Sequence, residues 1–485
     1  MKNKLNVIRI ILAAVRDIFA PAGRGVFALF KTALVLLLAF FMVWVNFTVD
    51  CSGYYHASSY EHAAALQMLA GNSIADYDKL NNRLLNQMYA ENLTGELDTL
   101  ALGSSRIKQL TCEIVGTDSF YNASVSGSDF YDMAGTFYLF VREGHVPKNL
   151  ILGIDPWLLN PDSSADNPRS DRELYNEYLS AAAAGETGYV PQSPFAKWAP
   201  LFDLSYFQGN INYFLRGAYT HTDTPGTETP AVVTGDPFKQ STNVLSNDGS
   251  LIYTPDFRNL SLAEVAGRAH IDASTFLGMD NFFTLDSARC ALFNQFIQYA
   301  QSLGVNVIFL MSPYHPLMYE YAVFYKQNYA GFFWAETWFT DYAKNKDIPL
   351  YGSYNSYALE YYEEDFYDGL HMRRETLAGF FPSLAEIAVQ QEAGTAGSAW
   401  QYRSEMVPYT AAERIVATIN NLPPPQTLVR GEDEVIEGES AYVLLRYAGA
   451  PGTSTLLARY AVVKSTGYYY RYDTSIGGWV HDRRI

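Results

Sequence analysis

The sequence predicts an α/β protein whose main domain has three layers, with helices on both faces of a parallel five-stranded sheet. Two observations lead to this prediction. Five short segments are continuous apolar runs, as expected of strands that are buried on both faces. Segments with the helical spacing of apolar residues separate most of these runs, as crossover connections between parallel strands require. With 48% hydrophobic residues among 485, the chain has ample apolar surface to form such a core.

The chain begins with a basic segment that leads into a long apolar run. Residues 1–25 are predicted to be cytoplasmic, with an interfacial helix at residues 5–19 that carries Arg9 and Arg16 on one face. Residues 32–49 contain no charge, and with Lys31 extended toward the headgroups they approach the ~20 residues that span a bilayer. We therefore expect a transmembrane signal anchor at residues 26–49. A cleaved signal peptide is the alternative, but no small-residue cleavage site follows promptly.

The elements after the anchor are expected in the following order. Residues 50–96 form a mainly helical linker (helix 58–92), residues 97–390 the three-layer domain, and residues 398–485 a small α+β accessory domain. Within the three-layer domain, residues 160–284 are too many for a structureless loop and are predicted to form an inserted cap over the strand ends. The domain's strands are expected at 97–102, 119–125, 149–154, 305–311 and 348–351, and its helices at 128–143, 287–303, 318–344 and 373–391. The accessory domain should have a helix at 410–420 and strands at 441–446, 456–464 and 468–473.

The charge distribution limits the environment and the partners of the chain. The formal net charge is −17, but residues 1–49 carry six basic residues against Asp17 alone, which gives +5 and leaves −22 for the rest. The positive-inside rule then places the N-terminus in the cytoplasm and the bulk of the chain outside the cell membrane. The acidic body disfavours nucleic acid as a partner, and favours a neutral or weakly charged polymer over a polyanion.

Cysteine usage and known motifs argue against several classes of site. Three cysteines exclude a disulfide scaffold and a four-cysteine zinc site, although a single bridge between Cys112 and Cys290 stays open. The chain contains no Walker-type loop, no His-Glu-x-x-His and no dinucleotide fingerprint. We therefore expect no metal and no organic cofactor.

Polar residues that suit acyl-transfer chemistry follow three of the expected strands. Residues 103–106 (Gly-Ser-Ser-Arg) follow the first strand, where a serine on a tight turn can project its hydroxyl into a cleft. Gly127 follows the second strand and lets backbone N–H groups approach a ligand. Asp368 and His371, three residues apart after the fifth strand, can lie side by side, so that the carboxylate orients the imidazole. Each motif alone is common in loops, whereas the combination is more specific.

In this order the three segments resemble the SGNH/GDSL hydrolase superfamily. The resemblance covers residues 97–390 and implies that Ser105 is the nucleophile, His371 the base and Asp368 the acid. It also implies that backbone N–H groups of Ser105 and Gly127 form an oxyanion hole. The family has an asparagine after the third strand, where this chain has Asp155. A carboxylate would repel an oxyanion, so we expect Asp155 to be neutral, turned away or used for substrate hydroxyls.

The resemblance implies an extracytoplasmic serine esterase or O-acyltransferase that acts on a cell-envelope polysaccharide. Such relatives include D-alanine transfer proteins and exopolysaccharide acetylation proteins, and they commonly work beside a multi-spanning membrane O-acyltransferase. Weaker candidates for substrate contacts are Arg106, Asp155, Trp157 and His315. Two alternatives stay open: a non-catalytic scaffold that binds glycan or a membrane partner, and a metal-dependent phosphate-ester enzyme.

Overall fold

The computed structural model describes most of the chain, in two units. The first unit comprises residues 1–61 and 191–229, and the second comprises residues 62–190 and 230–485. The helix expected at residues 5–19 lies outside the described residues. The described residues are 23–50, 59–162, 166–167, 170–182, 198, 201–215, 229–276, 278–279, 281–325, 328–397, 407, 409–420, 422, 428–448, 455–464 and 468–481.

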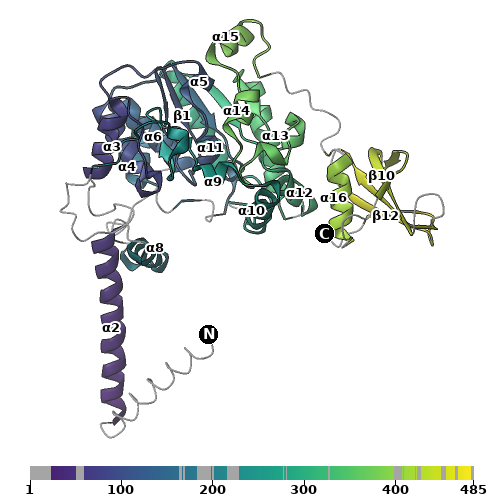
Figure 1. The fold of residues 1–485 in the computed structure, drawn as a ribbon, viewed down its shortest axis with the longest axis horizontal. Helices are drawn as coiled ribbons and strands as arrows, with labels where there is room; N and C mark the ends of the chain where they lie inside the picture. The colour runs from purple at the N-terminus through teal and green to yellow at the C-terminus, as the bar shows by residue number, and fades with distance from the viewer. Residues whose placement is uncertain are drawn as a thin grey trace. The chain divides into compact units, whose positions relative to one another are not determined.

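A five-stranded parallel sheet forms the centre of the second unit (Figure 1), as the sequence predicts. The strand order is β2-β1-β3-β6-β7, and every neighbouring pair is parallel. The carboxyl ends of all five strands therefore meet at one edge, where ligands bind in open parallel sheets. The strands are β1 (Thr99–Leu102), β2 (Phe120–Asn122), β3 (Asn149–Gly153), β6 (Asn306–Met311) and β7 (Leu350–Gly352).

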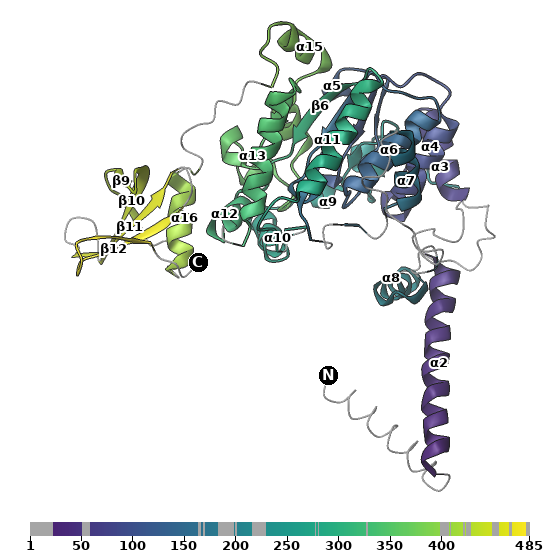
Figure 2. The ribbon, with the colours of Figure 1, turned by 180° about the vertical axis from the view of Figure 1, so that it is seen from behind.

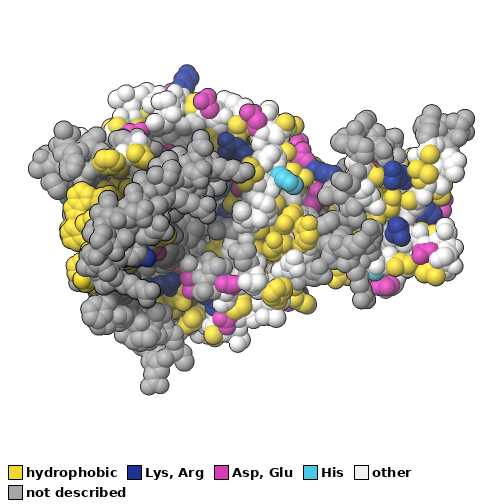
Figure 3. Space-filling view, turned by 90° about the horizontal axis from the view of Figure 1, so that it is seen from below, with side chains coloured by type: hydrophobic (Ala, Val, Ile, Leu, Met, Phe, Trp, Pro, Cys, Tyr) yellow, Lys and Arg dark blue, Asp and Glu magenta, His cyan; other side chains and the backbone are white. Residues whose placement is uncertain are grey.

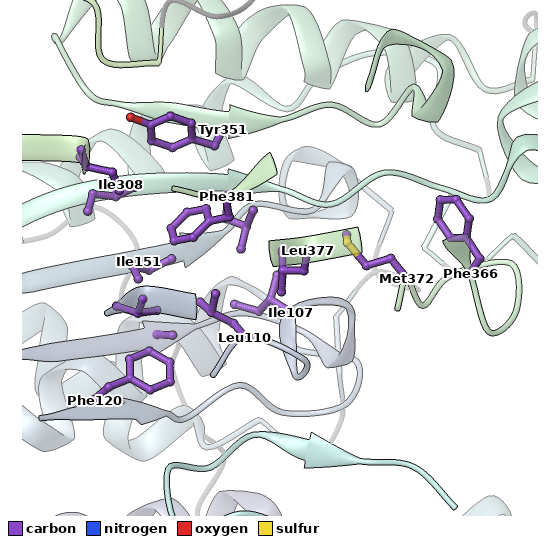
Figure 4. Close-up of a cluster of buried hydrophobic side chains, with 14 residues drawn as sticks. Ile107, Leu110, Phe120, Ile151, Ile308, Tyr351, Phe366, Met372, Leu377 and Phe381 are labelled. Carbon is purple, nitrogen blue, oxygen red and sulfur yellow. The ribbon is translucent and has the colours of Figure 1, made fainter. Parts of the chain in front are cut away.

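Helices cover one face of this sheet through an apolar cluster. Leu377 and Phe381 lie over Ile151 and Ile308 (Figure 4), and all four side chains are at most 3% exposed. Burial of side chains of this size contributes roughly 1.5–3 kcal/mol each, which makes the cluster a main source of stability. The helices on this face are α5 (Cys112–Val115), α14 (Arg374–Phe380) and α15 (Leu384–Glu392).

Aromatic side chains dominate the other face of the sheet. The ring of Phe309 in β6 lies 5.7 Å from that of Phe293 and 6.3 Å from that of Tyr342. These two rings belong to different helices, so the contacts join both helices to the sheet. The domain thus has the three layers that the sequence predicts, and its two sides can be followed in Figures 1 and 2. The helices on this face are α6 (Phe130–Arg142), α11 (Ser287–Ser302) and α13 (Ala330–Asn345).

The helix expected at residues 58–92 is two helices, α3 (Ser59–Leu69) and α4 (Asn82–Asn92). Gly71 ends the first with a left-handed backbone (φ 88°), and the side chain of Asn81 caps the second. The second helix packs against the sheet domain, since Asn86 donates to the Ala123 carbonyl oxygen at 2.7 Å.

Two further expected helices are also broken. The helix at 318–344 is α12 (Pro316–Phe324) followed by α13. Near the start of α13, Gly331 packs so closely that a Cβ there would lie 2.2 Å from the Phe282 ring. The helix at 373–391 is α14 followed by α15, because Pro382 forces Phe381 into an extended conformation (ψ 113°).

The insertion at residues 160–284 contributes to both units. Residues 191–229 belong to the first unit, and the remainder belongs to the second. The hairpin of this remainder is joined to the segment after β1, because Leu251 N–H donates to the Lys108 carbonyl oxygen at 2.8 Å. The insertion contains α7 (Arg172–Ala181), α8 (Leu204–Leu215), a 3₁₀ turn (Pro237–Lys239), β4 (Val244–Leu245), β5 (Leu251–Ile252), α9 (Pro255–Arg258) and α10 (Leu262–Ser274).

The accessory segment is α+β, but it has more strands than expected. Within its described residues a helix accompanies an antiparallel six-stranded sheet, of which the sequence predicts three strands. The sheet's core includes Val443, Ala461 and Tyr470. The elements are α16 (Tyr409–Ile419), β8 (Leu428–Arg430), β9 (Glu434–Ile436), β10 (Glu439–Ala448), β11 (Thr455–Val463), β12 (Tyr469–Asp473) and β13 (Gly478–His481).

The first unit contains helix α2 (Gly23–Val49), which includes the expected anchor. Its segment Leu29–Val49 has a mean hydropathy of 2.2 over its most apolar window, of which only 11% is buried. Among the described residues it is the one helix long and apolar enough to cross a membrane.

Candidate active site

Ser105 stands on a tight turn at the carboxyl end of β1. A 3₁₀ helix (Ser105–Ile107) starts there, and the side chain of Ser104 caps it by accepting the N–H of Arg106 at 3.2 Å. Gly103 is required for this turn, because a Cβ there would lie 2.9 Å from Cδ1 of Ile107 and 3.1 Å from Cα of Gly153. The turn leaves Ser105 half-buried.

The second part of the site is the turn that carries Asp368 and His371. Oδ1 of Asp368 accepts the backbone N–H groups of Leu370 and His371, each at 2.8 Å. These two hydrogen bonds stabilise the turn and orient the Asp368 carboxylate independently of its contact with the imidazole. Nδ1 of His371 lies 3.0 and 2.9 Å from the two carboxylate oxygens of Asp368.

His371 joins the two turns, which are 266 residues apart in the sequence. Its Nε2 lies 2.9 Å from Oγ of Ser105. If Nδ1 carries the proton that Asp368 accepts, Nε2 is free to take the proton of the Ser105 hydroxyl. The side chains of His371 and Asp368 are 18% and 15% exposed, so a ligand can reach the site. The structure thus brings together the three residues that the sequence predicts as nucleophile, base and acid.

The electrostatic environment favours an ion pair between His371 and Asp368. Burial disfavours the charged imidazole, but the charge of Asp368 and its hydrogen bond outweigh burial and raise the pKa of His371. Burial likewise opposes ionisation of Asp368, but His371 and the backbone N–H donors lower the pKa of its carboxyl. Both shifts stabilise the imidazolium–carboxylate pair relative to the neutral pair.

The loop after β2, which carries Gly127, is hydrogen-bonded to the serine turn. Val125 N–H donates to the Gly103 carbonyl oxygen at 3.0 Å, which holds the loop after β2 against the serine turn. In that loop Gly127 has a left-handed backbone (φ 60°), and its carbonyl oxygen accepts from the Asn167 side chain. Within the described part of the chain, the N–H groups of Ser105 and Gly127 have no acceptor.

Arg106 and Asp155, both weak candidates for substrate contacts, contact each other. Nη1 of Arg106 lies 2.7 Å from Oδ1 of Asp155, and the two side chains are 1% and 6% exposed. The guanidinium also lies over the Tyr314 ring and donates to the carbonyl oxygens of Ser312 and Pro313. Burial raises the pKa of Asp155, while Arg106 and Ser104 act in the opposite direction. Asp155 is therefore the counter-ion of a buried arginine.

Trp157 and His315 are structural rather than exposed to a ligand. The indole N–H of Trp157 donates to the Ser128 carbonyl oxygen at 2.9 Å, and the side chain is too buried to stack on a sugar. Nδ1 of His315 accepts the N–H of Leu317 and caps α12. Burial lowers the pKa of His315 to about 4, so the ring is neutral near neutral pH. Trp157 and His315 are only 4% and 0% exposed, so the fold does not favour substrate contact by either residue, and that contact stays a prediction.

The insertion adds two residues to the site that the sequence analysis does not identify. Oδ2 of Asp272 in α10 accepts the N–H of Gly369 at 2.9 Å, inside the turn that carries the acid and the base. The ring of Tyr253 lies edge-on to His371, with the ring centroids 6.1 Å apart. Neither residue belongs to a motif, and only the folding of the insertion against the sheet brings them here.

A group of potential metal ligands lies elsewhere in the domain. Ligand atoms of Cys112, Glu113 and Asp248 lie within 4.8 Å of one another. However, Asp248 already accepts hydrogen bonds from Cys112 N–H and from Ser250, and burial raises the pKa of the Cys112 thiol to about 12. A protonated thiol and an occupied carboxylate are poor ligands, so we assign no metal to this group. Cys112 and Cys290 are both free, so the bridge left open by the sequence does not form.

Comparisons with known proteins found no family model, no curated protein and no solved structure that matches this chain. The functional assignment therefore depends on the geometry of the site itself.

Proposed function

We propose that this protein is a membrane-anchored serine esterase or O-acyltransferase that acts on acyl esters of a cell-envelope polysaccharide. The observation that carries the proposal is the continuous hydrogen-bonded series from Asp368 through His371 to Ser105. This arrangement is the one that activates a serine hydroxyl in unrelated hydrolases.

In the proposed mechanism Oγ of Ser105 attacks the carbonyl carbon of the acyl ester, and Nε2 of His371 takes the hydroxyl proton. The N–H groups of Ser105 and Gly127 stabilise the oxyanion of the tetrahedral intermediate. The imidazolium of His371 then protonates the leaving alkoxide, and the acyl group stays on Ser105. Water or a sugar hydroxyl, deprotonated by His371, attacks this acyl-enzyme and releases Ser105. No metal or organic cofactor is required for these steps.

The substrate class rests on the resemblance to extracytoplasmic SGNH proteins and on the composition of the chain. Tyrosine is abundant, with 37 residues, and aromatic rings suit contacts with sugar faces. On the described part of the face in Figure 3, acidic and basic side chains lie interspersed among hydrophobic ones. A neutral or weakly charged glycan suits such a surface better than a polyanion does. A multi-spanning O-acyltransferase is the partner that the resemblance implies.

Turnover of p-nitrophenyl acetate by the purified full-length protein tests the proposal. Ser105→Ala should reduce kcat/KM by about a thousandfold or more, because it removes the nucleophile. Ser104→Ala is the matched control, since Ser104 caps the same turn but its hydroxyl does not contact His371, and it should retain most of the activity. Equal turnover by wild type and Ser105→Ala would contradict the proposal.

A non-catalytic scaffold that binds glycan or a membrane partner is the second candidate. The pairing of Asp155 with Arg106 favours it, because the side-chain donor that the family places there is missing. Absence of turnover in the wild-type protein would support this reading. A phosphate-ester enzyme would instead show activity that EDTA abolishes.

A further inference from the structure

Side-chain hydrogen bonds of Asn46 and Asn210 join α8 and the residues before it to the carboxyl-terminal end of α2. Nδ2 of Asn46 donates to the carbonyl oxygens of Leu201 and Asp203, at 3.0 and 3.2 Å. Oδ1 of Asn46 accepts from the side chain of Asn210 at 3.1 Å. Asn46 and Asn210 are both fully buried. A polar side chain near the end of an apolar span thus has its partners in α8, which lies beside the carboxyl-terminal end of α2 in Figures 1 and 2.

The contact between the two helices reaches well inside the apolar span. Phe207 of α8 meets Phe41 of α2 edge-on, with ring centroids 6.1 Å apart. Phe41 lies eight residues before Val49, where α2 ends, so this contact is about 12 Å from the end of the helix at ~1.5 Å per residue. If α2 crosses a bilayer, α8 cannot make this contact from the water.

The exposed side chains of α8 and of the residues before it are mainly apolar, although Asp203 and Gln208 are exposed as well. Phe202, Leu204 and Leu215 are 67, 61 and 74% exposed. The helix sequence from residue 204 to residue 215 has no charged residue, and it is flanked by Asp203 and Arg216. The apolar side chains of α2 are exposed to a similar degree, with Leu36 and Phe40 at 63 and 67%. A surface of this kind is stable only when something apolar covers it.

We propose that α8 (Leu204–Leu215) lies in the half of the bilayer next to the carboxyl end of α2, with lipid acyl chains as the occupant of its apolar face. Tyr206 marks the boundary with water: its hydroxyl donates to Asp50 at 2.7 Å, just after the apolar span ends. The chain therefore enters the membrane twice, once as the anchor and once in the middle of the insertion. This attachment is independent of the proposed catalytic activity.

Fluorescence quenching of the full-length protein in phosphatidylethanolamine–phosphatidylglycerol vesicles tests the proposal. The three native cysteines are replaced by serine, and an environment-sensitive fluorophore is attached to a single cysteine, in Leu204→Cys or in Leu215→Cys. Leu36→Cys in α2 is the lipid-facing control, and Ile271→Cys in α10, 66% exposed, is the water-facing control. Each variant is first checked for an unchanged thermal unfolding transition.

We expect probes at 204 and 215 to be quenched severalfold more by nitroxide-labelled lipids than the probe at 271, and severalfold less by aqueous iodide. Iodide quenching equal to that at 271 would overturn the proposal. Protection from iodide without quenching by nitroxide lipids would also overturn it, because a second copy of the protein would then cover α8. A probe at 36 that lipids do not quench would show that α2 itself does not span, which removes the basis of the proposal.

Asn46→Leu gives a second, independent test. It removes the side-chain hydrogen bonds that hold α8 but leaves α2 apolar, so the probe at 215 should become severalfold more accessible to iodide while the probe at 36 is unchanged. Unchanged accessibility at 215 would contradict the role of Asn46 in holding α8 in the bilayer.

Discussion

His371 makes the proposed chemistry dependent on pH. Only the neutral imidazole can take the proton of Ser105, and the pKa of His371 is raised above its ordinary value of 6.5. Ester turnover should therefore be lost as the pH falls through a pKa above 6.5. A pH profile of kcat/KM measures this directly. An acid limb clearly below pH 6.5 would contradict the environment described for His371.

Asp272 acts as a positioning residue for the same turn. It accepts the N–H of Gly369, and its charge contributes to the raised pKa of His371. Asp272→Asn should therefore move the acid limb of kcat/KM to lower pH and reduce kcat, with little change in KM. Glu264→Gln, on the same helix but exposed and bonded to Ser261, is the control and should change neither. A loss of activity in Asp272→Asn with an unmoved acid limb would indicate a structural role only.

The sequence predicts the residues of the site that belong to local turns, but not those that depend on tertiary packing. Ser105 follows β1 directly, and the Asp368–His371 pair follows β7 after two 3₁₀ helices, so the sequence order places both at the carboxyl edge of the parallel sheet. Arg106 and Asp155 also follow neighbouring strands, β1 and β3, but their pairing was not predicted, because the strand order is known only from the structure. No sequence pattern could have placed Asp272, because its helix lies in an insertion whose path the sequence does not define.

At the scale of elements, close packing beneath the serine turn gives a stability prediction. A Cβ at Gly153 in β3 would lie 2.8 Å from Cδ1 of Ile107. Gly153→Ala should therefore lower the free energy of unfolding by about 1–3 kcal/mol. Gly267→Ala in α10 is the control, because nothing lies within 4 Å of its Cβ and alanine is the better helix former by roughly 1 kcal/mol. Denaturant unfolding measures both, and equal stability of the two variants would contradict the packing described.

The existence of the elements is easier to predict than their continuity. All five apolar runs are strands of the parallel sheet, because burial on both faces leaves a clear signature. The break before α15 could have been predicted from Pro382, and the break after α3 from Gly71. The break between α12 and α13 has no comparable signal, since residues 325–330 contain neither proline nor glycine. The edge strands β8 and β13 were missed because half or more of their residues are exposed or only partly buried.

At the scale of the whole molecule, the uneven charge leads to a prediction about topology. Residues 1–49 carry a net charge of +5 and end in an apolar helix, whereas the rest of the chain carries −22. By the positive-inside rule, the N-terminus should stay in the cytoplasm and the acidic part of the chain should lie outside. In intact spheroplasts, a tag at the N-terminus should resist added protease, while a tag at the C-terminus should be digested. The mature protein should also retain its first residues. Digestion of the N-terminal tag, or loss of the segment by cleavage, would contradict the signal anchor.

The central claim is that Ser105 is a nucleophile activated by His371. Its most direct test is to treat the full-length protein with a fluorophosphonate and locate the adduct by mass spectrometry of its peptides. We expect one adduct, on Ser105, that is present in Ser104→Ala and absent from Ser105→Ala and from His371→Ala. An adduct that persists in Ser105→Ala, or a wild-type protein that takes none, would show that Ser105 is not an activated nucleophile.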